Sequence, residues 1–139
     1  MNFFKARSSE ASADALRILS VGQCGFDHRT IARVFKNRLG VKVIGSSTFT
    51  EASKALCSKT FQLVLINRVL NFDGTSGIEW IRRMKADPTQ SETPVMLVSN
   101  YPDAQSQAEE LGALPGFGKS SLHSATVLAR LRGILQPVA

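Results

Sequence analysis

The stretch Phe61-Gln62-Leu63-Val64-Leu65-Ile66-Asn67 is the most apolar segment that reads as a β-strand in this 139-residue chain. Leu63 to Ile66 are all apolar and lack the alternation of a half-exposed strand, which is typical of a central parallel strand covered by helices on both faces. A loop of Asn, Asp, Gly, Thr and Ser residues follows at 71–76. The segment therefore predicts a buried parallel strand whose carboxyl end leads into a polar loop.

Shorter strands and helices alternate on both sides of this central strand. Four more strands are predicted, at 17–21, 41–44, 94–99 and 114–117. Between and after them, apolar residues recur every three or four positions, which indicates five helices. The side chains expected to cap four of these helices are Asp27, Thr48 together with Glu51, Asp103, and either Ser121 or Ser124.

Alternation of strands and helices predicts βαβ crossovers and therefore the α/β class. We expect a doubly wound, five-stranded parallel sheet with helices on both faces, formed by one domain over residues 16–139. A chain of this length is suited to a single hydrophobic core. Residues 1–15 are polar, rich in small residues and unpatterned, and are predicted to be a flexible amino-terminal arm.

The chain is basic, with 17 Lys and Arg residues against 11 Asp and Glu residues and a formal net charge of +6. This charge suggests nucleic acid as one class of partner. No segment approaches the roughly 18 apolar residues of a membrane-spanning helix, and the start lacks the apolar region of a signal peptide. We therefore expect a cytoplasmic protein without membrane contact, whose Cys24 and Cys57 are reduced, partly buried thiols.

Function in an open α/β sheet is expected at the carboxyl ends of its strands, where ligands and reactive groups gather. Gly22 and Gln23 follow the first predicted strand, and Asn67 ends the third. Ser99 ends the fourth predicted strand, and Lys119 follows the fifth. Together with their neighbours Cys24, Asn100 and Gly118, these are the positions at which function is expected.

Five segments together resemble the receiver domain of response regulators, which has a CheY-like, flavodoxin-like fold. They are Arg-Ile-Leu-Ser-Val at 17–21, Leu-Val-Leu-Ile-Asn at 63–67, Gly-Ile-Glu-Trp-Ile at 77–81, Thr-Pro-Val-Met-Leu-Val-Ser at 93–99, and Leu-Gly-Ala at 111–113 with Gly-Phe-Gly-Lys-Ser at 116–120. The resemblance extends over the chain after its first 15 residues. It implies the strand order 2-1-3-4-5.

The resemblance assigns a role to five of these positions, which form the candidate site: Gly22, Gln23, Asn67, Ser99 and Lys119. Receivers accept a phosphoryl group on an aspartate at the end of strand 3, and two acidic residues after strand 1 help to hold Mg²⁺. Here the acceptor position is Asn67, and the acidic pair is replaced by Gly22 and Gln23. An amide is not a nucleophile of this kind, and Mg²⁺ prefers anionic oxygen ligands. The sequence therefore resembles a pseudo-receiver that is not phosphorylated and binds no Mg²⁺ or other cofactor.

Ser99 and Lys119 match the hydroxyl and the lysine that contact the phosphoryl group in receivers. With the acids gone, Lys119 is expected to be the only charge in the pocket. It would either form a weak anion site with Ser99, Asn67 and Gln23, or bond to Asn67 or to a carbonyl. We expect the second arrangement.

The output switch of receivers is also expected to be altered. The resemblance places a rotating aromatic side chain three residues before Lys119, where this chain has Gly116, and the adjacent Phe117 is expected to point to the other face of the sheet. Asp73 lies in a loop that is about two residues longer than is usual for the family. It is either a displaced acceptor or, as we expect, part of a solvated Asp-Gly turn.

A basic surface is the remaining candidate. Helical spacing places Arg29, Arg33 and Lys36 on one face of a helix, and the last helix carries Arg130 and Arg132. These are either ordinary solvated faces or a patch for an acidic protein or nucleic acid. Cys24 is expected to be structural instead of redox-active, and His28 and His123 are expected at the surface.

We therefore expect a stand-alone receiver-like domain of two-component (phosphorelay) signalling that is not an enzyme. It would act as a phosphorylation-independent interaction module whose partner is a histidine kinase, another receiver or an output protein. The resemblance also allows a second copy of the chain as a partner. The alternative is a small basic regulator that associates with nucleic acid.

Overall fold

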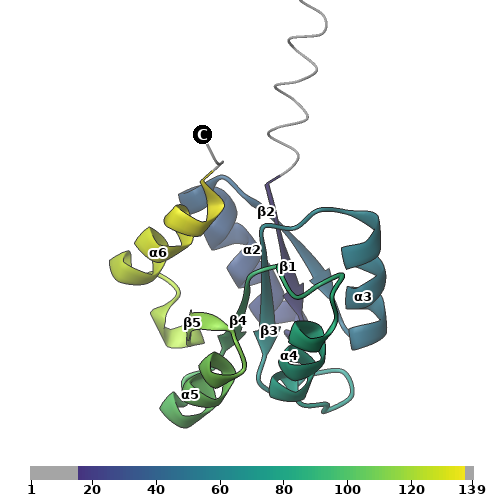
Figure 1. Cartoon of the computed structure of the whole chain (residues 1–139). Coiled ribbons are helices and arrows are strands. Elements are labelled where there is room, and N and C mark those ends of the chain that lie inside the picture. Colours follow the sequence, from purple (N-terminus) through teal and green to yellow (C-terminus); the bar gives the residue numbers. More distant parts are fainter. Residues whose placement is uncertain (1–15, 137–139) are drawn as a thin grey trace, which may run out of the picture.

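The computed structural model describes residues 16–136, and the predicted arm at 1–15 lies outside the described residues. Five parallel strands form one sheet in the order β2-β1-β3-β4-β5, which confirms the predicted fold class and strand order (Figure 1). The strands are β1 (Arg17–Val21), β2 (Lys42–Ser46), β3 (Leu63–Asn67), β4 (Val95–Val98) and β5 (Leu114–Phe117).

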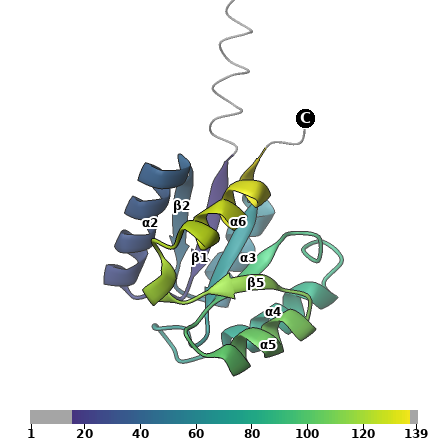
Figure 2. The same ribbon diagram turned by 90° about the vertical axis from the view of Figure 1, so that its left-hand side faces the viewer.

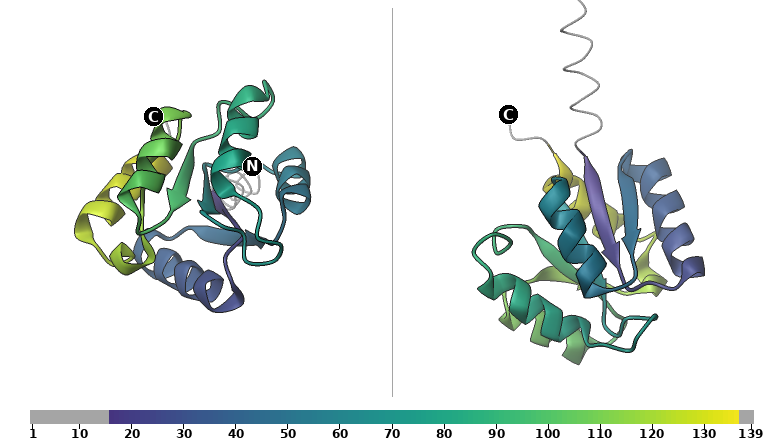
Figure 3. Two further views of the ribbon diagram at one scale, coloured as in Figure 1. Left: turned by 90° about the horizontal axis from the view of Figure 1, so that it is seen from below. Right: turned by 90° about the vertical axis from the view of Figure 1, so that its right-hand side faces the viewer.

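Helices cover both faces of the sheet, and the chain returns through one of them after each strand (Figures 2 and 3). They are α2 (Gly25–Leu39), α3 (Phe49–Ser58), α4 (Gly77–Ala86), α5 (Pro102–Glu110) and α6 (Ala125–Leu135), with a short 3₁₀ helix, η1 (Lys119–Ser121), after β5. The first and last helices, α2 and α6, pack on one face, and α3, α4 and α5 pack on the other. None of the helices within 16–136 is both long and apolar enough to cross a bilayer.

The central strand β3 contributes to both cores, as its continuous apolar sequence predicts. Leu63 and Leu65 belong to the core under α2 and α6, whereas Val64 and Ile66 belong to the core under α3, α4 and α5. All four side chains are fully buried. Such burial contributes roughly 1.5–3 kcal/mol for each side chain, so β3 is a rigid base for the residues at its carboxyl end.

The helix caps agree with the sequence at two helices and differ at two others. Thr48 and Ser124 accept a hydrogen bond from the third residue of α3 and α6, as predicted. The predicted cap Asp27 is wrong, because the Sγ of Cys24 accepts from the Asp27 backbone N–H at 3.4 Å and α2 begins at Gly25. Asp103 is also not a cap, since α5 begins one residue earlier, at Pro102.

Candidate functional site

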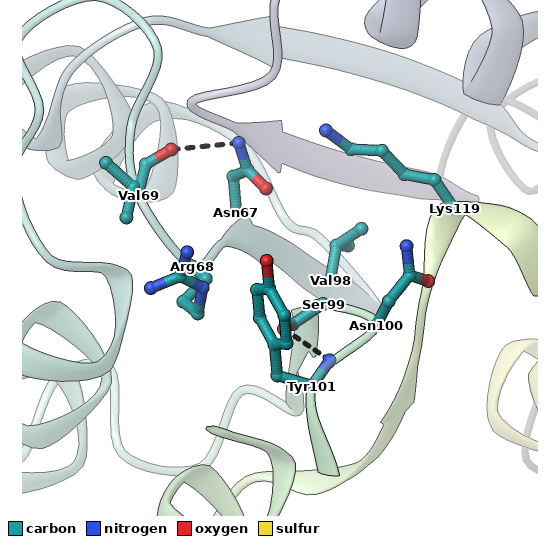
Figure 4. A pocket seen from close by; sticks show the side chains of 8 residues that line it. All are labelled: Asn67, Arg68, Val69, Val98, Ser99, Asn100, Tyr101 and Lys119. Carbon is teal, nitrogen blue, oxygen red and sulfur yellow. Dashed lines mark hydrogen bonds between the residues drawn. The ribbon is translucent and has the colours of Figure 1, made fainter. Parts of the chain in front are cut away.

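The carboxyl ends of β3, β4 and β5 surround a pocket of about 390 Å³ (Figure 4). Figure 3 (left) looks onto this edge of the molecule. Three of the five candidate residues line the pocket together, namely Asn67, Ser99 and Lys119. The other lining residues are Arg68, Val69, Val98, Asn100 and Tyr101. The two remaining candidates, Gly22 and Gln23, are not among them.

Asn67 uses its amide hydrogens to bind the surrounding backbone. Its Nδ2 donates to the carbonyl oxygen of Val69 at 2.9 Å and to that of Gly22 at 3.3 Å (Figure 4 shows the first bond). A carboxylate in this place has no hydrogen to donate and would face two carbonyl oxygens. The local structure is therefore matched to an amide at position 67.

Leu70 occupies the space beside Gly22 where a side chain would begin. Gly22 has a φ of +80°, and a Cβ built on it would overlap the Cγ of Leu70, a residue that is fully buried. The carbonyl of Gly22 already accepts hydrogen bonds from Asn67 Nδ2 and from the Asn71 N–H. Position 22 therefore offers Mg²⁺ neither a side chain nor a free carbonyl, and the cation does not fit this set of residues.

Gln23 does not contribute to the pocket either, contrary to the prediction that it lies around Lys119. It lines a separate cavity with Ser20 and His28, between the ends of β1 and β2 and the first turn of α2. His28 is accordingly half-buried and not a surface residue as predicted, whereas His123 is exposed. Within residues 16–136, no three His, Cys, Asp or Glu side chains are grouped as metal ligands.

Lys119 forms an ion pair with Asp27, and this contact is the largest departure from the sequence analysis. Its Nζ lies 2.6 Å from Oδ2 of Asp27 in the first turn of α2. The expectation of a lone positive charge, bonded to Asn67 or to a carbonyl, is therefore wrong. The hydrogen bond from Lys119 lowers the pKa of the Asp27 carboxyl below its usual value, against the opposing effect of burial. Asp27 stands three residues after the Cys24 cap, a spacing at which capping boxes place an acid.

Tyr101 and Arg68 form one wall of the pocket and were not recognised as site residues from the sequence. Tyr101 is 59% exposed, and the Arg68 guanidinium lies 4.8 Å from the centroid of its ring. The backbone N–H of Tyr101 donates to Ser99 Oγ at 3.1 Å (Figure 4). The Ser99 hydroxyl therefore accepts a bond from its own loop, next to a cation–π pair.

The structure also explains why position 116 has no side chain. The pairing of β4 with β5 contains a β-bulge. Met96 pairs with Leu114 and Val98 pairs with Phe117, so β5 has one more residue than β4 between the two pairs. A Cβ at Gly116 would overlap the carbonyl oxygen of Leu97.

Phe117, next to this bulge, points to the α2 face, where its ring centroid is 6.1 Å from that of Phe35. The predicted direction of Phe117 is confirmed.

The loop between β3 and α4 forms a compact turn. Val69 and Ser76 form an antiparallel bridge, and Oδ1 of Asp73 accepts hydrogen bonds from the N–H and the hydroxyl of Thr75. Asp73 is thus a turn residue on the surface, as expected, and does not line the pocket at Asn67. Cys57 is exposed and not partly buried as predicted.

The predicted basic residues differ in what their side chains contact. Arg29, Arg33 and Lys36 are exposed on α2, and α2 packs against α6. Arg130 is half-buried and donates to the carbonyl oxygens of Pro115 and Gly116, whereas Arg132 is exposed and donates to the carbonyl of Arg38 at 3.4 Å. Arg130 therefore binds the backbone of the edge strand β5 instead of projecting freely.

Comparison with known proteins identifies the fold. No protein-family model matches the sequence, and no curated protein matches it. Among solved structures, the chain is similar to the signal receiver domain of a DNA binding response regulator protein (merR) from Colwellia psychrerythraea 34H, with 18% identity, a TM-score of 0.74, and coverage of 88% of this chain and 99% of that one.

Two further structures have the same fold. A putative response regulator from Chloroflexus aurantiacus J-10-fl is 17% identical, with a TM-score of 0.74 over 86% of this chain and 96% of that one. The phosphorylated cyanobacterial phytochrome response regulator RcpA is 22% identical, with a TM-score of 0.63 over 85% of this chain and 89% of that one. This chain therefore has the receiver-domain fold of two-component response regulators.

Proposed function

We propose that this chain is a phosphorylation-independent protein-interaction module of a two-component signalling system, in the cytoplasm, with a binding role and no enzymatic one. The observation that supports it most directly is that the three candidate side chains lining the 390 Å³ pocket each have a partner within the chain. Asn67 is bonded to two backbone carbonyls, Lys119 is paired with Asp27, and Ser99 accepts from Tyr101. The receiver fold is present, while these three side chains are each bonded to the backbone or to another side chain of the same chain.

The chemistry of position 67 supports the same proposal. Phosphoryl transfer to a receiver requires an anionic oxygen as nucleophile, whereas the Asn67 oxygen is neutral and the nitrogen lone pair is delocalised. The cation that would neutralise the transferring group has no acidic ligands at positions 22 and 23. Both the nucleophile and the metal site are therefore missing from the edge to which the resemblance assigns them.

The exposed apolar side chains support a protein as the partner. Within residues 16–136, the large hydrophobic side chains that are exposed are Phe26, Val69, Phe72 and Tyr101. All four lie on segments that follow β1, β3 or β4 at the carboxyl edge of the sheet. Exposed apolar groups gathered on one edge are typical of protein contacts. We therefore favour a histidine kinase, another receiver or an output protein as the partner.

Phosphorylation by a small-molecule donor tests the proposal. The chain is incubated with acetyl phosphate and Mg²⁺, and its intact mass is measured beside a receiver domain that retains the acceptor aspartate and the acidic pair. We expect the control to gain about 80 Da, the mass of a phosphoryl group, and this chain to gain none. A stoichiometric adduct on the wild-type chain would overturn the proposal.

The variant Asn67→Asp separates the two missing parts of the site. It supplies the carboxylate but leaves Leu70 beside Gly22, and it adds no acid at positions 22 and 23. We expect Asn67→Asp to remain unmodified under the same conditions. Modification of this variant alone would show that only the nucleophile is missing and that the cation site is intact.

A further inference from the structure

A second cavity lies on the other side of the β1 carboxyl end and is independent of the function proposed above. Its volume is about 190 Å³, and it shares no lining residue with the 390 Å³ pocket. It is partly open to solvent and is bounded by the end of β1, the end of β2 and the first turn of α2. Its lining residues are Ser20, Gln23, Gly25, His28, Gly45, Ser46 and Ser47.

Polar atoms without partners are concentrated in this cavity. Five buried side-chain nitrogen or oxygen atoms within residues 16–136 have no hydrogen-bond partner, and four of them are Ser20 Oγ, Gln23 Nε2, Gln23 Oε1 and His28 Nδ1. The fifth, on Glu79, lies 3.6 Å from Arg82 Nε. Ser20 is only 1% exposed, so its hydroxyl does not reach bulk solvent.

Orphaned polar groups of this kind are unfavourable. Each buried, unpaired donor or acceptor costs about 1–3 kcal/mol, and folded proteins pair nearly all of them. Four such atoms on three side chains around one cavity therefore indicate a polar occupant. The cavity has room for it, because a single water molecule needs only about 10–15 Å³ of such space.

The lining also indicates the chemical class of the occupant. No Asp, Glu, Lys or Arg lines the cavity, so its wall carries no permanently charged side chain. The Gln23 carboxamide offers a donor beside an acceptor, and the Ser20 hydroxyl offers both on one atom. An amide group presents the complementary donor and acceptor.

The backbone at Gly45 makes room for the third polar side chain. A Cβ at Gly45 would lie 2.9 Å from Cε1 of His28, closer than real Cβ atoms approach other atoms. The absence of a side chain at Gly45 therefore lets the imidazole lie against β2 and line the cavity.

We propose that this cavity binds a small, uncharged molecule that bears an amide group.

Acetamide is the probe for this proposal, and acetate is its charged counterpart of the same shape. The full chain is titrated with each, and the backbone amide resonances of Ser20, Gln23, His28 and Gly45 are followed by NMR. We expect saturable shifts at these residues with acetamide and none with acetate. Saturation by acetate would overturn the uncharged class, and shifts that rise linearly without saturating would show a cavity that holds only water.

Two variants locate the effect. Gln23→Leu removes the carboxamide and keeps a side chain of similar size, so we expect it to weaken acetamide binding at least about tenfold, as the loss of one or two hydrogen bonds predicts. Gln107→Leu, on the exposed surface of α5, is the matched control and should bind as the wild type does. If Gln23→Leu does not fold, Ser20→Ala replaces it; unchanged affinity in the folded variant would overturn the proposal.

Discussion

Gly22 shows how one backbone conformation keeps a side chain out of the site. Its φ of +80° is unfavourable for residues with a Cβ, and Leu70 occupies the space that the Cβ would need. Gly40, the cap after α2, has a similar φ of +65°, but no atom lies within 4 Å of its hypothetical Cβ. Both glycines therefore have a backbone conformation that is unfavourable for other residues, but only at Gly22 would a Cβ also collide with a neighbouring side chain.

This difference predicts unequal losses of stability. Gly40→Ala should lose about 1–2 kcal/mol, the cost of a left-handed backbone for a residue with a Cβ. Gly22→Ala should lose more, because Leu70 must also move out of a closely packed core. Urea unfolding of both variants measures the two free energies. Equal losses would mean that Leu70 yields readily and that position 22 is open to side chains.

The Asp27–Lys119 pair predicts a dependence of stability on pH. The pKa of Asp27 is lowered in the folded protein, so the stabilisation is present above the unfolded value of about 3.9 and is lost as the pH falls through the lower folded value. The difference in unfolding free energy between wild type and Asp27→Asn should therefore shrink as the pH falls from about 3.9 towards and through the lower pKa of the folded state.

Urea unfolding over an acidic pH series measures this difference. Asp103→Asn is the matched control, because Asp103 is exposed and forms no ion pair within residues 16–136. Its difference from wild type should change less with pH. A difference for Asp27→Asn that stays constant throughout the series would contradict the ion pair as a source of stability.

Single residues also show where prediction from sequence ends. Asn67, Ser99 and Lys119 could be placed together because the ends of parallel strands meet at one edge. The partner of Lys119 could not be predicted, because Asp27 was assigned to the cap of α2 and not to its first turn. The direction of the Gln23 side chain likewise could not be predicted, because it depends on the path that the backbone takes between β1 and α2.

At the scale of elements, the strand β5 depends on a side chain from α5. Gln105 Oε1 accepts from the Gly116 N–H at 3.2 Å, and its Nε2 donates to the carbonyls of Leu97 and Ser99 at 3.0 and 3.1 Å. These bonds join β4 to β5 at the bulge, where the regular ladder is interrupted. A sheet edge with such a gap needs a polar side chain to satisfy its backbone.

Removing this side chain should loosen the edge strand. We expect Gln105→Leu to lose about 1–3 kcal/mol, because three buried or half-buried backbone groups lose their partner. The Gly116 amide should also exchange its hydrogen faster. Chemical unfolding and hydrogen exchange measure the two effects, with the exposed Gln107→Leu as the control. Unchanged exchange at Gly116 would mean that β5 is held by its ladder alone.

Elements as a whole were easier to predict than their ends. The run Leu63–Ile66 and the helical spacing on either side were enough for the order of strands and helices, because burial on one or both faces fixes the period of apolar residues. The caps were less certain, since Cys24 is a weak acceptor and Tyr101 makes no capping bond with its side chain. The bulge in β5 left no sequence pattern beyond the Pro115-Gly116 pair.

At the scale of the whole molecule, the receiver fold alone would suggest that Mg²⁺ binds, whereas the residues at positions 22, 23 and 67 predict that it does not. A ligand that binds only the folded state raises its stability, by about 2.7 kcal/mol at a concentration 100 times its dissociation constant. Because Gly22, Gln23 and Asn67 offer no suitable ligand set, we expect Mg²⁺ to leave the melting temperature as it is in NaCl of equal ionic strength. A melting temperature that rises in Mg²⁺ but not in NaCl would show that the folded chain binds the cation.

The contact of Leu70 with Gly22 has a consequence for redesign. A phosphorylatable site of the receiver kind needs acids at positions 22, 23 and 67. The first of these would collide with Leu70, and the last would face two carbonyl oxygens. Either of these two substitutions made alone should lower the stability of a chain that, like most, has little to spare, and neither completes the site. Building a phosphorylatable site at this edge would therefore take several coupled substitutions, with Leu70 replaced before an acid enters position 22.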